Sequence, residues 1–284
     1  MIVITGATGA LNGATADHLL TRIPPSELVV VARDPAKAQH FAERGVTVRY
    51  GDFTEPASLP PAFDGAQKLL LVSSSDPSED AVTLHRAAID AAVGVGVGHV
   101  LYTSHQGAAA DSPFRPARDH AATEQLLAES GLTWTALRNG FYLHSLRWLL
   151  GPWRETGVIA VPGDGPVSWT AREDAAEAAA ALIVSDQDFT GPVTMTARQA
   201  PTFAEIADIA TAAAGRRIRF EDIDPDDWTR AQLAAGTPAP VAGFLLGMYQ
   251  AAAGGFFAGT DPTLPARLGR EPRTVQDFLA AELG

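Results

Sequence analysis

The sequence predicts an α/β fold that contains a doubly wound parallel sheet. Short, almost continuously apolar runs alternate with longer helical patterns through the first half of the chain, as in sheets covered on both faces. A glycine-rich turn follows the first run, which makes the sheet Rossmann-type. The predicted strands cover residues 2–5, 28–32, 46–49, 68–73, 99–104 and 133–137. The predicted helices between them cover residues 14–22, 35–44, 79–95 and 118–130.

This alternation loosens in the second half of the chain. A turn-rich link at 161–169, a helix at 172–185 and a strand at 191–197 precede a mostly helical, proline-punctuated remainder. We therefore expect a nucleotide-binding Rossmann domain over residues 1–140, completed by about 170–197. Residues 141–169 and 198–284 form a smaller, partly helical C-terminal lobe suited to a substrate. Its apolar stretch at 241–257 either roofs a cleft or belongs to the core.

Composition narrows the classes of function. The net charge is −12, from 33 acidic and 21 basic residues, which disfavours nucleic acids and anionic membrane surfaces as partners. There is no cysteine, so disulfides and thiolate chemistry are excluded, and a reducing compartment is indicated. No signal peptide or membrane-spanning run is recognisable, so we expect a cytoplasmic protein. The histidines lack paired metal-ligand spacing, and no metal site is predicted.

The stretch "ITGATGALNG" is the first functional motif. Gly6 and Gly9 allow a sharp bend and the close approach of a pyrophosphate, and a helix N-terminus would follow. Asn12 stands where a third glycine is usual. Asparagine is small and can offer its amide to a phosphate, while Gly13 can take over the close approach of helix and sheet. The turn is therefore predicted to bind a dinucleotide.

The end of the second predicted strand bears on which dinucleotide is bound. NAD-binding proteins usually place a carboxylate there, whereas NADP-binding proteins place an arginine. Here Arg33 follows the strand, with Lys37 one helical turn further on, and both could reach a 2′-phosphate. Asp34 could instead serve a ribose, so NAD stays possible, but NADP is favoured.

Two further strands end at the same predicted sheet edge. Asp52 and Phe53 follow the third strand, where adenine normally rests, and Ser73 to Ser75 follow the fourth, near the middle of the cofactor. Because the carboxyl ends of parallel strands meet at one edge, these residues are expected to converge on one crevice.

At this point the chain resembles a known family. The segments "TGATGAL", "ARDPAK", "GDFTEP", "YTS", "ATEQLLAESGLTWTALRNGFY" and "GREPRTVQDFL" resemble the NmrA-like atypical short-chain dehydrogenases. Within them the chain is most similar to type 2 NAD(P)H:quinone oxidoreductases and triphenylmethane reductase. The resemblance implies a Rossmann-type domain holding extended NADP and a C-terminal domain closing over the nicotinamide.

Carried over residue by residue, the resemblance implies a set of cofactor contacts. These are Gly6, Thr8, Gly9, Ala10, Leu11, Arg33, Lys37, Asp52, Phe53, Ser73 and Ser74, with Asn139, Gly140 and Phe141 beside the nicotinamide. Asn12 is a further candidate for cofactor binding because of its place in the turn. Tyr142 completes the "NGFY" segment beside the substrate. Asn12 departs from the family's usual glycine, which affects helix placement more than binding.

The chain lacks the catalytic pair of ordinary short-chain dehydrogenases. None of its four tyrosines is followed four residues later by a lysine. This favours electron-poor, conjugated acceptors such as quinones, whose reduced anion needs no strong acid. Candidate assisting residues are Ser104, His105, His120 and Tyr142.

The resulting prediction is an NADPH-dependent reductase of quinone-like or aromatic small molecules, monomeric or homodimeric. Two alternatives remain open at this stage. One is a non-catalytic NADP(H)-sensing regulatory protein, and the other is a reductase dedicated to a biosynthetic pathway.

Overall fold

The computed structural model describes residues 1–74, 79–185, 187 and 189–283. The chain forms two compact units. The first unit comprises Met1–His105, Asp119–Arg138 and Glu173–Val193, and the second comprises Gln106–Arg118, Asn139–Arg172 and Thr194–Gly284. Each unit has its own core, so each is described in turn.

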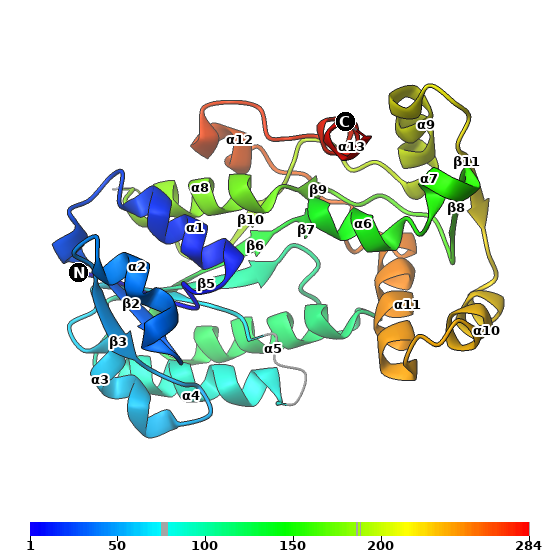
Figure 1. The fold of residues 1–284 in the computed structure, drawn as a ribbon. Helices are drawn as coiled ribbons and strands as arrows, with labels where there is room; N and C mark the ends of the chain where they lie inside the picture. The colour runs from blue at the N-terminus through cyan, green and yellow to red at the C-terminus, as the bar shows by residue number, and fades with distance from the viewer. Residues whose placement is uncertain (75–78, 186, 188, 284) are drawn as a thin grey trace. The chain divides into compact units, whose positions relative to one another are not determined.

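The first unit is built on a seven-stranded sheet in the order β10-β6-β5-β4-β1-β2-β3 (Figure 1). Its strands are β1 Ile2–Thr5, β2 Leu28–Ala32, β3 Thr47–Tyr50, β4 Lys68–Leu71, β5 His99–His105, β6 Thr133–Asn139 and β10 Gly191–Met195. The pairs β1–β2, β2–β3, β1–β4 and β4–β5 are parallel. From β1 the chain first adds β2 and β3 on one side and then β4, β5 and β6 on the other, so the strand order reverses at β1. Ligands bind at this switch point in such sheets. The predicted Rossmann-type fold is confirmed.

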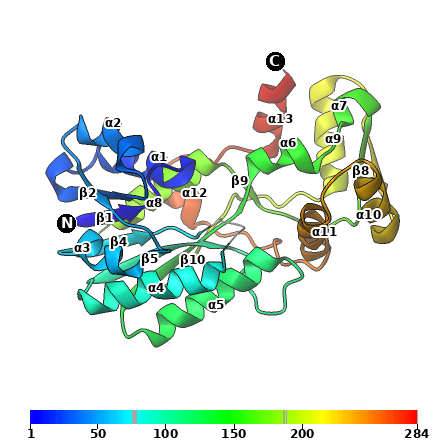
Figure 2. The ribbon, with the colours of Figure 1, turned by 60° about the horizontal axis from the view of Figure 1, so that its bottom comes forward.

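Helices cover both faces of this sheet, with α1 and α8 on one face and α4 and α5 on the other (Figures 1 and 2). The helices associated with this sheet are α1 Ala10–Leu19, α2 Gln39–Ala42, α3 Leu59–Phe63, α4 Ala81–Gly94, α5 Arg115–Glu129 and α8 Arg172–Ile183. Short 3-10 turns occupy Pro25–Glu27, Pro35–Ala38 and Pro56–Ser58. The strands read as continuous apolar runs because both sheet faces are buried; every residue of β2 is buried, for example.

The second unit packs helices around two small sheets. Strand β8 (Val158–Val161) pairs with β11 (Arg219–Asp222), and β7 (Phe141–Tyr142) pairs with β9 (Trp169–Thr170). Its helices are the 3-10 turn Leu143–Ser145, α6 Leu146–Leu149, α7 Trp153–Thr156, α9 Phe203–Ala214, α10 Pro225–Ala234, α11 Ala239–Ala253, α12 Thr263–Leu268 and α13 Val275–Leu283.

The apolar stretch at 241–257 mostly belongs to the core of this unit. Met248, Tyr249 and Phe257 are buried, and Tyr249 donates its hydroxyl to the carbonyl oxygen of Leu149 at 2.7 Å. Val241 and Phe244, nearer the start of α11, are each 46% exposed. Among the described residues, no helix is long and apolar enough to cross a membrane.

Candidate functional site

The turn between β1 and α1 has the geometry of an anion-binding turn. Gly6 has a φ of +67°, and a Cβ placed on it would lie 2.8 to 2.9 Å from the Val72 side chain. Gly9 caps α1, and its N–H donates to the carbonyl oxygen of Gly6 at 2.9 Å. The first N–H groups of α1 therefore start beside a glycine-lined hollow, as an anion requires.

Helix α1 begins at Ala10, four residues before the predicted start. Asn12, which stands in place of the usual glycine, makes this earlier helix start possible. Asn12 is buried and its Nδ2 donates to the carbonyl oxygen of Thr5 at 2.9 Å, which ties the first helical turn to the end of β1. Gly13 provides the close approach, since a Cβ there would lie 2.8 Å from the Ala7 carbonyl oxygen.

This arrangement corrects one sequence-based expectation. The amide of Asn12 was expected to be available to a phosphate, but it is used inside the protein, with the side chain 1% exposed. The residue therefore supports the turn from behind.

A groove of about 510 Å³ runs along the carboxyl ends of β1, β2, β3 and β4. It is lined by Thr5, Gly6, Thr8, Gly9, Val31, Ala32, Arg33, Asp34, Lys37, Gly51, Asp52, Phe53, Thr54, Val72, Ser73, Ser74 and Leu84. The structure thus brings together most of the predicted cofactor residues of the first unit. Ala10 and Leu11 lie in the first turn of α1, outside this lining, and Ser75 falls outside the described residues.

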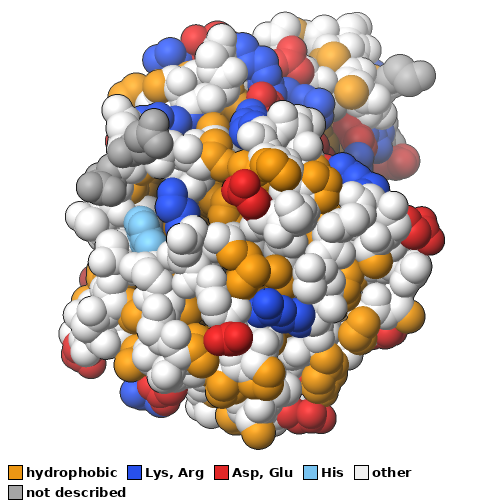
Figure 3. All heavy atoms as spheres, turned by 90° about the vertical axis from the view of Figure 1, so that its left-hand side faces the viewer, with side chains coloured by type: hydrophobic (Ala, Val, Ile, Leu, Met, Phe, Trp, Pro, Cys, Tyr) orange, Lys and Arg blue, Asp and Glu red, His pale blue; other side chains and the backbone are white. Residues whose placement is uncertain are grey.

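The basic end of the groove follows β2. Arg33 and Lys37 are both exposed, and Lys37 Nζ lies 3.9 Å from an Asp34 carboxylate oxygen. Asp34 also accepts the Ala36 N–H at 3.1 Å, which starts the 3-10 turn Pro35–Ala38. The carboxylate thus has a local capping role, while the two cations line the groove. Figure 3 shows acidic and basic side chains interspersed among apolar ones on the face it presents.

The segment that follows β4 along the groove is held by buried side chains from β1, β5 and α4. Thr5 Oγ1 accepts the Val72 N–H at 2.8 Å, and Thr103 Oγ1 accepts the Ser73 N–H at 2.8 Å. His85 Nε2 accepts the Ser74 N–H at 2.7 Å. Each backbone amide leaving the strand therefore has a fixed acceptor, which sets the course of this segment along the groove.

The hydrogen bonds of His85 assign its tautomer. Because Nε2 is an acceptor, Nδ1 carries the proton and donates to Thr123 Oγ1 at 2.8 Å; Thr123 in turn donates to the Asp119 carbonyl oxygen at 2.8 Å. Burial lowers the pKa of His85 to about 4, although Asp80 acts in the opposite direction. A neutral imidazole thus supports the groove at neutral pH.

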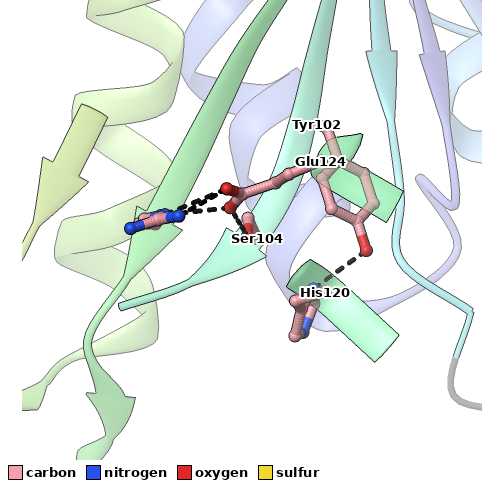
Figure 4. Close-up of polar contacts among 5 residues, drawn as sticks. Tyr102, Ser104, His120 and Glu124 are labelled. Atoms are coloured by element: carbon pink, nitrogen blue, oxygen red, sulfur yellow. Dashed lines mark hydrogen bonds and ion pairs between the residues drawn. The ribbon is translucent and has the colours of Figure 1, made fainter. Parts of the chain in front are cut away.

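Two of the predicted catalytic residues lie in a polar cluster at the end of β5 (Figure 4). Ser104 donates its hydroxyl to Glu124 Oε1 at 2.6 Å, and Arg138 holds the same carboxylate through Nε at 2.9 Å and Nη2 at 2.5 Å. The Ser104 proton is therefore directed at an internal carboxylate, which leaves the oxygen as an acceptor.

The second pair in this cluster joins the Tyr102 hydroxyl to His120 Nδ1 at 2.8 Å (Figure 4). Tyr102 is fully buried, which raises its pKa. Burial lowers the pKa of His105 to about 4, and that of His120 falls well below its ordinary value through burial and the neighbouring His105, His85 and Arg138. The rings of His105 and His120 stack with centroids 6.1 Å apart. Both histidines are thus held neutral at physiological pH.

The remaining predicted residues belong to the second unit. Asn139 Nδ2 donates to the Tyr142 hydroxyl at 3.4 Å, and Asn139 Oδ1 is buried with no hydrogen-bond partner in the described part of the chain. Gly140 is required by close packing, since a Cβ there would lie 2.1 Å from Thr170 Oγ1. Phe141 packs among Phe114, Trp169 and Phe257.

Sequence reasoning missed the partners that hold these residues. Glu124, Arg138 and His85 are far in sequence from the groups they bind, and so is Arg172, whose guanidinium lies over the Tyr142 ring. One signal was available for Arg172, because a cation is unusual at the start of a helix. No group of three or more histidine, aspartate or glutamate residues within the described ranges could hold a metal ion.

A Rossmann-type sheet with a glycine turn and a groove along its strand ends defines a dinucleotide-binding class of α/β protein. The chain belongs to the NmrA-like family, whose model matches residues 1–279. It is similar to quinone oxidoreductase 2 of Escherichia coli (strain K12), with 35% identity over 99% of this chain and 98% of the relative. It is also similar to the NAD(P)H azoreductase of Xenophilus azovorans, with 34% identity over 99% and 97%.

Solved structures agree with this assignment. The NADPH complex of the Escherichia coli quinone oxidoreductase superposes with a TM-score of 0.91 at 33% identity, covering 100% of both chains. The triphenylmethane reductase of Citrobacter sp., in complex with NADP(H), superposes with a TM-score of 0.88 at 29% identity and covers 99% of both chains.

Proposed function

We propose that this protein is an NADPH-dependent oxidoreductase that transfers a hydride to a quinone or a similar conjugated acceptor. The observation that carries the proposal is the groove, in which a glycine turn and the start of α1 share one sheet edge with Arg33 and Lys37. Relatives with quinone oxidoreductase, azoreductase and dye reductase activity in their names support the reaction class.

The residues present fit a dinucleotide. Gly6 gives the turn its positive φ and its close contact with Val72, and the first N–H groups of α1 suit a pyrophosphate. Asp52 and Phe53 would hold the adenosine end, and Ser73 and Ser74 the middle of the cofactor. When bound, the nicotinamide supplies the hydride, and the protein supplies binding and orientation.

Arg33 and Lys37 are proposed to select NADPH over NADH. Both line the groove at the end of β2, where the adenosine ribose of a dinucleotide lies in this class of fold. The carboxylate that could serve a ribose, Asp34, accepts a backbone N–H and lies near Lys37. Two cations at this point favour a 2′-phosphate.

The nicotinamide end is assigned to Asn139, Gly140 and Phe141. Asn139 presents a buried Oδ1 that lacks a hydrogen-bond partner among the described residues. A carboxamide N–H is a donor that would satisfy it. Gly140 and Phe141 keep this segment in place through contacts with Thr170 and the neighbouring aromatic rings.

The class of hydride acceptor is proposed from the side chains that could donate a proton to it. Lys37 lies near Asp34, and Lys68 Nζ donates to the Ile183 carbonyl oxygen at 2.5 Å. Ser104 donates to Glu124, and burial keeps His105 and His120 neutral. Such a set suits acceptors whose reduced form is a stabilised anion, and quinones are of this kind.

The test is oxidation of NADPH, and separately of NADH, by the purified protein with a panel of simple quinones. We expect turnover, with NADPH preferred. Tight NADPH binding without turnover on any acceptor would contradict the proposal.

That negative outcome would favour a second candidate, a non-catalytic NADP(H) sensor. Leu233, Val241 and Phe244, on α10 and α11, are each 46% exposed, as a partner-binding surface requires. A dedicated biosynthetic reductase would instead bind NADPH and turn over only its own substrate. We also propose that the protein is cytoplasmic, because a chain without cysteine suits a reducing compartment. We further propose that it is monomeric or homodimeric, and sedimentation analysis measures this oligomeric state.

A further inference from the structure

Arg172 has no carboxylate partner among the described residues, although the chain has 33 acidic residues against 21 basic ones. Some other arginines of the protein are paired with carboxylates, whereas the half-buried Arg49 donates to the backbone carbonyl oxygens of Pro61, Ala62 and Asp64. Arg138 binds Glu124, while Arg147 and Arg154 both bind Glu282. Arg172 is only partly exposed, so water alone does not solvate its charge. An uncompensated, half-buried cation is costly, and such groups concentrate at functional sites.

The position of Arg172 adds to this cost. It is the first residue of α8, where the positive end of the helix dipole disfavours a cation. Glu173 and Asp174 follow it and suit that end of the helix. Local helix energetics therefore do not account for an arginine at this place.

The partners of Arg172 are a phenol and an imidazole. Its guanidinium carbon lies 5.6 Å from the centroid of the Tyr142 ring. Its Nη2 lies against the ring of His144, 3.2 Å from Nδ1. His144 stacks on Tyr142 with ring centroids 5.7 Å apart. The cation is thus fixed beside the phenol by contacts on two sides.

The hydroxyl of Tyr142 remains a donor in this arrangement. It accepts from Asn139 Nδ2 at 3.4 Å, which leaves its own proton available. Burial raises the pKa of Tyr142 to about 12, while the charge of Arg172 and the Asn139 hydrogen bond act in the opposite direction. The phenol is therefore protonated at neutral pH, and the adjacent cation strengthens it as a hydrogen-bond donor.

We propose that Tyr142 donates a hydrogen bond to the acceptor's carbonyl oxygen, and that Arg172 is a positioning residue whose charge makes Tyr142 a stronger donor. In this proposal Tyr142 of β7 and Arg172 of α8 stabilise the reacting oxygen, a role that the tyrosine–lysine pair has in ordinary short-chain dehydrogenases. This inference rests on the proposed function, because it requires hydride transfer to a carbonyl-bearing acceptor.

The chemistry balances for a quinone. The hydride and its electron pair leave NADPH and form a bond at the quinone, so NADP⁺ is released and one quinone oxygen becomes an anion. Tyr142 stabilises that oxyanion by its hydrogen bond, with Arg172 behind it. Solvent supplies the proton that completes the hydroquinone, so Tyr142 ends the cycle protonated.

The experiment is a double-mutant cycle with Arg172→Gln, Tyr142→Phe and the double variant, measured as steady-state quinone reduction by NADPH. We expect Tyr142→Phe to lower kcat by roughly 100- to 1,000-fold, as removal of an oxyanion donor does, and Arg172→Gln to lower it by a smaller factor because the donor remains. The double variant should be scarcely slower than Tyr142→Phe alone, because Arg172 acts through Tyr142. Arg172→Lys should recover part of the rate, since it restores the charge.

Further measurements separate this role from a purely structural one. Arg230→Gln removes an arginine that is 69% exposed and paired with Asp227, and it should leave kcat unchanged. The NADPH dissociation constant and the melting temperature of Arg172→Gln should stay near those of the unaltered protein. Reduction of a cationic triphenylmethane dye forms no oxyanion, so Arg172→Gln should not slow it. The double-mutant cycle measured with a quinone is sufficient to support or overturn the inference.

Independent effects of the two substitutions, or an unchanged kcat in Arg172→Gln, would overturn the inference while leaving the proposed function intact. Absence of any quinone turnover by the unaltered protein would overturn both.

Discussion

The groove of the first unit, which we propose holds the cofactor, and the Tyr142–Arg172 pair of the second unit differ in how their polar groups are satisfied. Behind the groove, the amides of Val72, Ser73 and Ser74 each meet a neutral acceptor on a neighbouring element. Beside Tyr142, a guanidinium stands without a carboxylate among the described residues. A rigid, fully bonded wall suits equilibrium binding of a cofactor, whereas an uncompensated charge suits a group that becomes negative only during reaction.

The comparison also shows what sequence can reveal. The groove depends on local features, namely glycines at a turn and polar residues directly after strands. The Tyr142–Arg172 pair depends on a tertiary contact between β7 and the start of α8, which no spacing in the sequence announces. The following predictions test this division, from the largest expected effect to the smallest.

The largest effect is expected from Gly6→Val. The positive φ and the overlap with Val72 each cost about 1–3 kcal/mol, so the turn must move, and NADPH affinity should fall by roughly 100-fold or more. A fluorescence titration with NADPH measures this. Gly94→Ala is the control, because a Cβ at that position of α4 meets nothing within 4 Å. Wild-type affinity in Gly6→Val would show that the turn does not hold the cofactor.

The second effect concerns acid stability and His85. Its folded-state pKa of about 4 lies below its ordinary 6.5, so the folded protein binds fewer protons than the unfolded chain between these values. Stability is therefore lost as the pH falls through this range, by about 2 kcal/mol between pH 7 and pH 5 from this residue.

His85→Gln isolates that contribution. Glutamine can accept from Ser74 through its carbonyl oxygen and donate to Thr123, so the contacts are kept without the titration. Urea unfolding at pH 7 and pH 5 should show a smaller loss for His85→Gln than for the unaltered protein. The exposed His40→Gln serves as control. Equal losses in both proteins would contradict a neutral, buried His85.

The third effect is the selectivity of the groove. Replacing Arg33 and Lys37 together by glutamine should weaken NADPH binding roughly tenfold and leave NADH binding unchanged, since exposed cations contribute modestly after solvent screening. The effect should shrink as salt is added. Calorimetric titration of both nucleotides measures it. Equal weakening of NADPH and NADH would show that these cations do not read the 2′-phosphate.

The smallest effect is expected from Asn12→Ala. The substitution removes the hydrogen bond to the Thr5 carbonyl oxygen and should cost about 1 kcal/mol of stability. Because the amide faces inward, NADPH affinity should stay within about threefold, a range that corresponds to less than about 1 kcal/mol. Denaturant unfolding and nucleotide titration separate the two outcomes. A large loss of affinity at full stability would mean that Asn12 contacts the phosphates after all.

Much of the fold could be read from the sequence, because continuous apolar runs mark strands buried on both faces; β1 and β2 have their predicted bounds. The start of α1 could not. Gly9, Asn12 and Gly13 suggest a turn, yet the Asn12 contact and the close approach at Gly13 draw this segment into the helix. Tertiary packing overrode local preference there.

The candidate site divides in the same way. Residues following strands were found because parallel strand ends converge whatever the rest of the fold does. Glu124, whose carboxylate accepts the hydrogen bond from Ser104, lies on α5, and Arg172, the cation beside Tyr142, lies on α8. Pairings of this kind are set by how helices pack on a sheet, so periodicity cannot supply them.

The measurement that tests the central claim most directly is a titration of the unaltered protein with NADPH and with NADH under identical salt. The groove with Arg33 and Lys37 predicts saturable binding of NADPH, tighter than NADH by about tenfold or more, as charge-assisted hydrogen bonds to a phosphate provide. Equal affinities, or a preference for NADH, would contradict the assignment of this groove to NADPH.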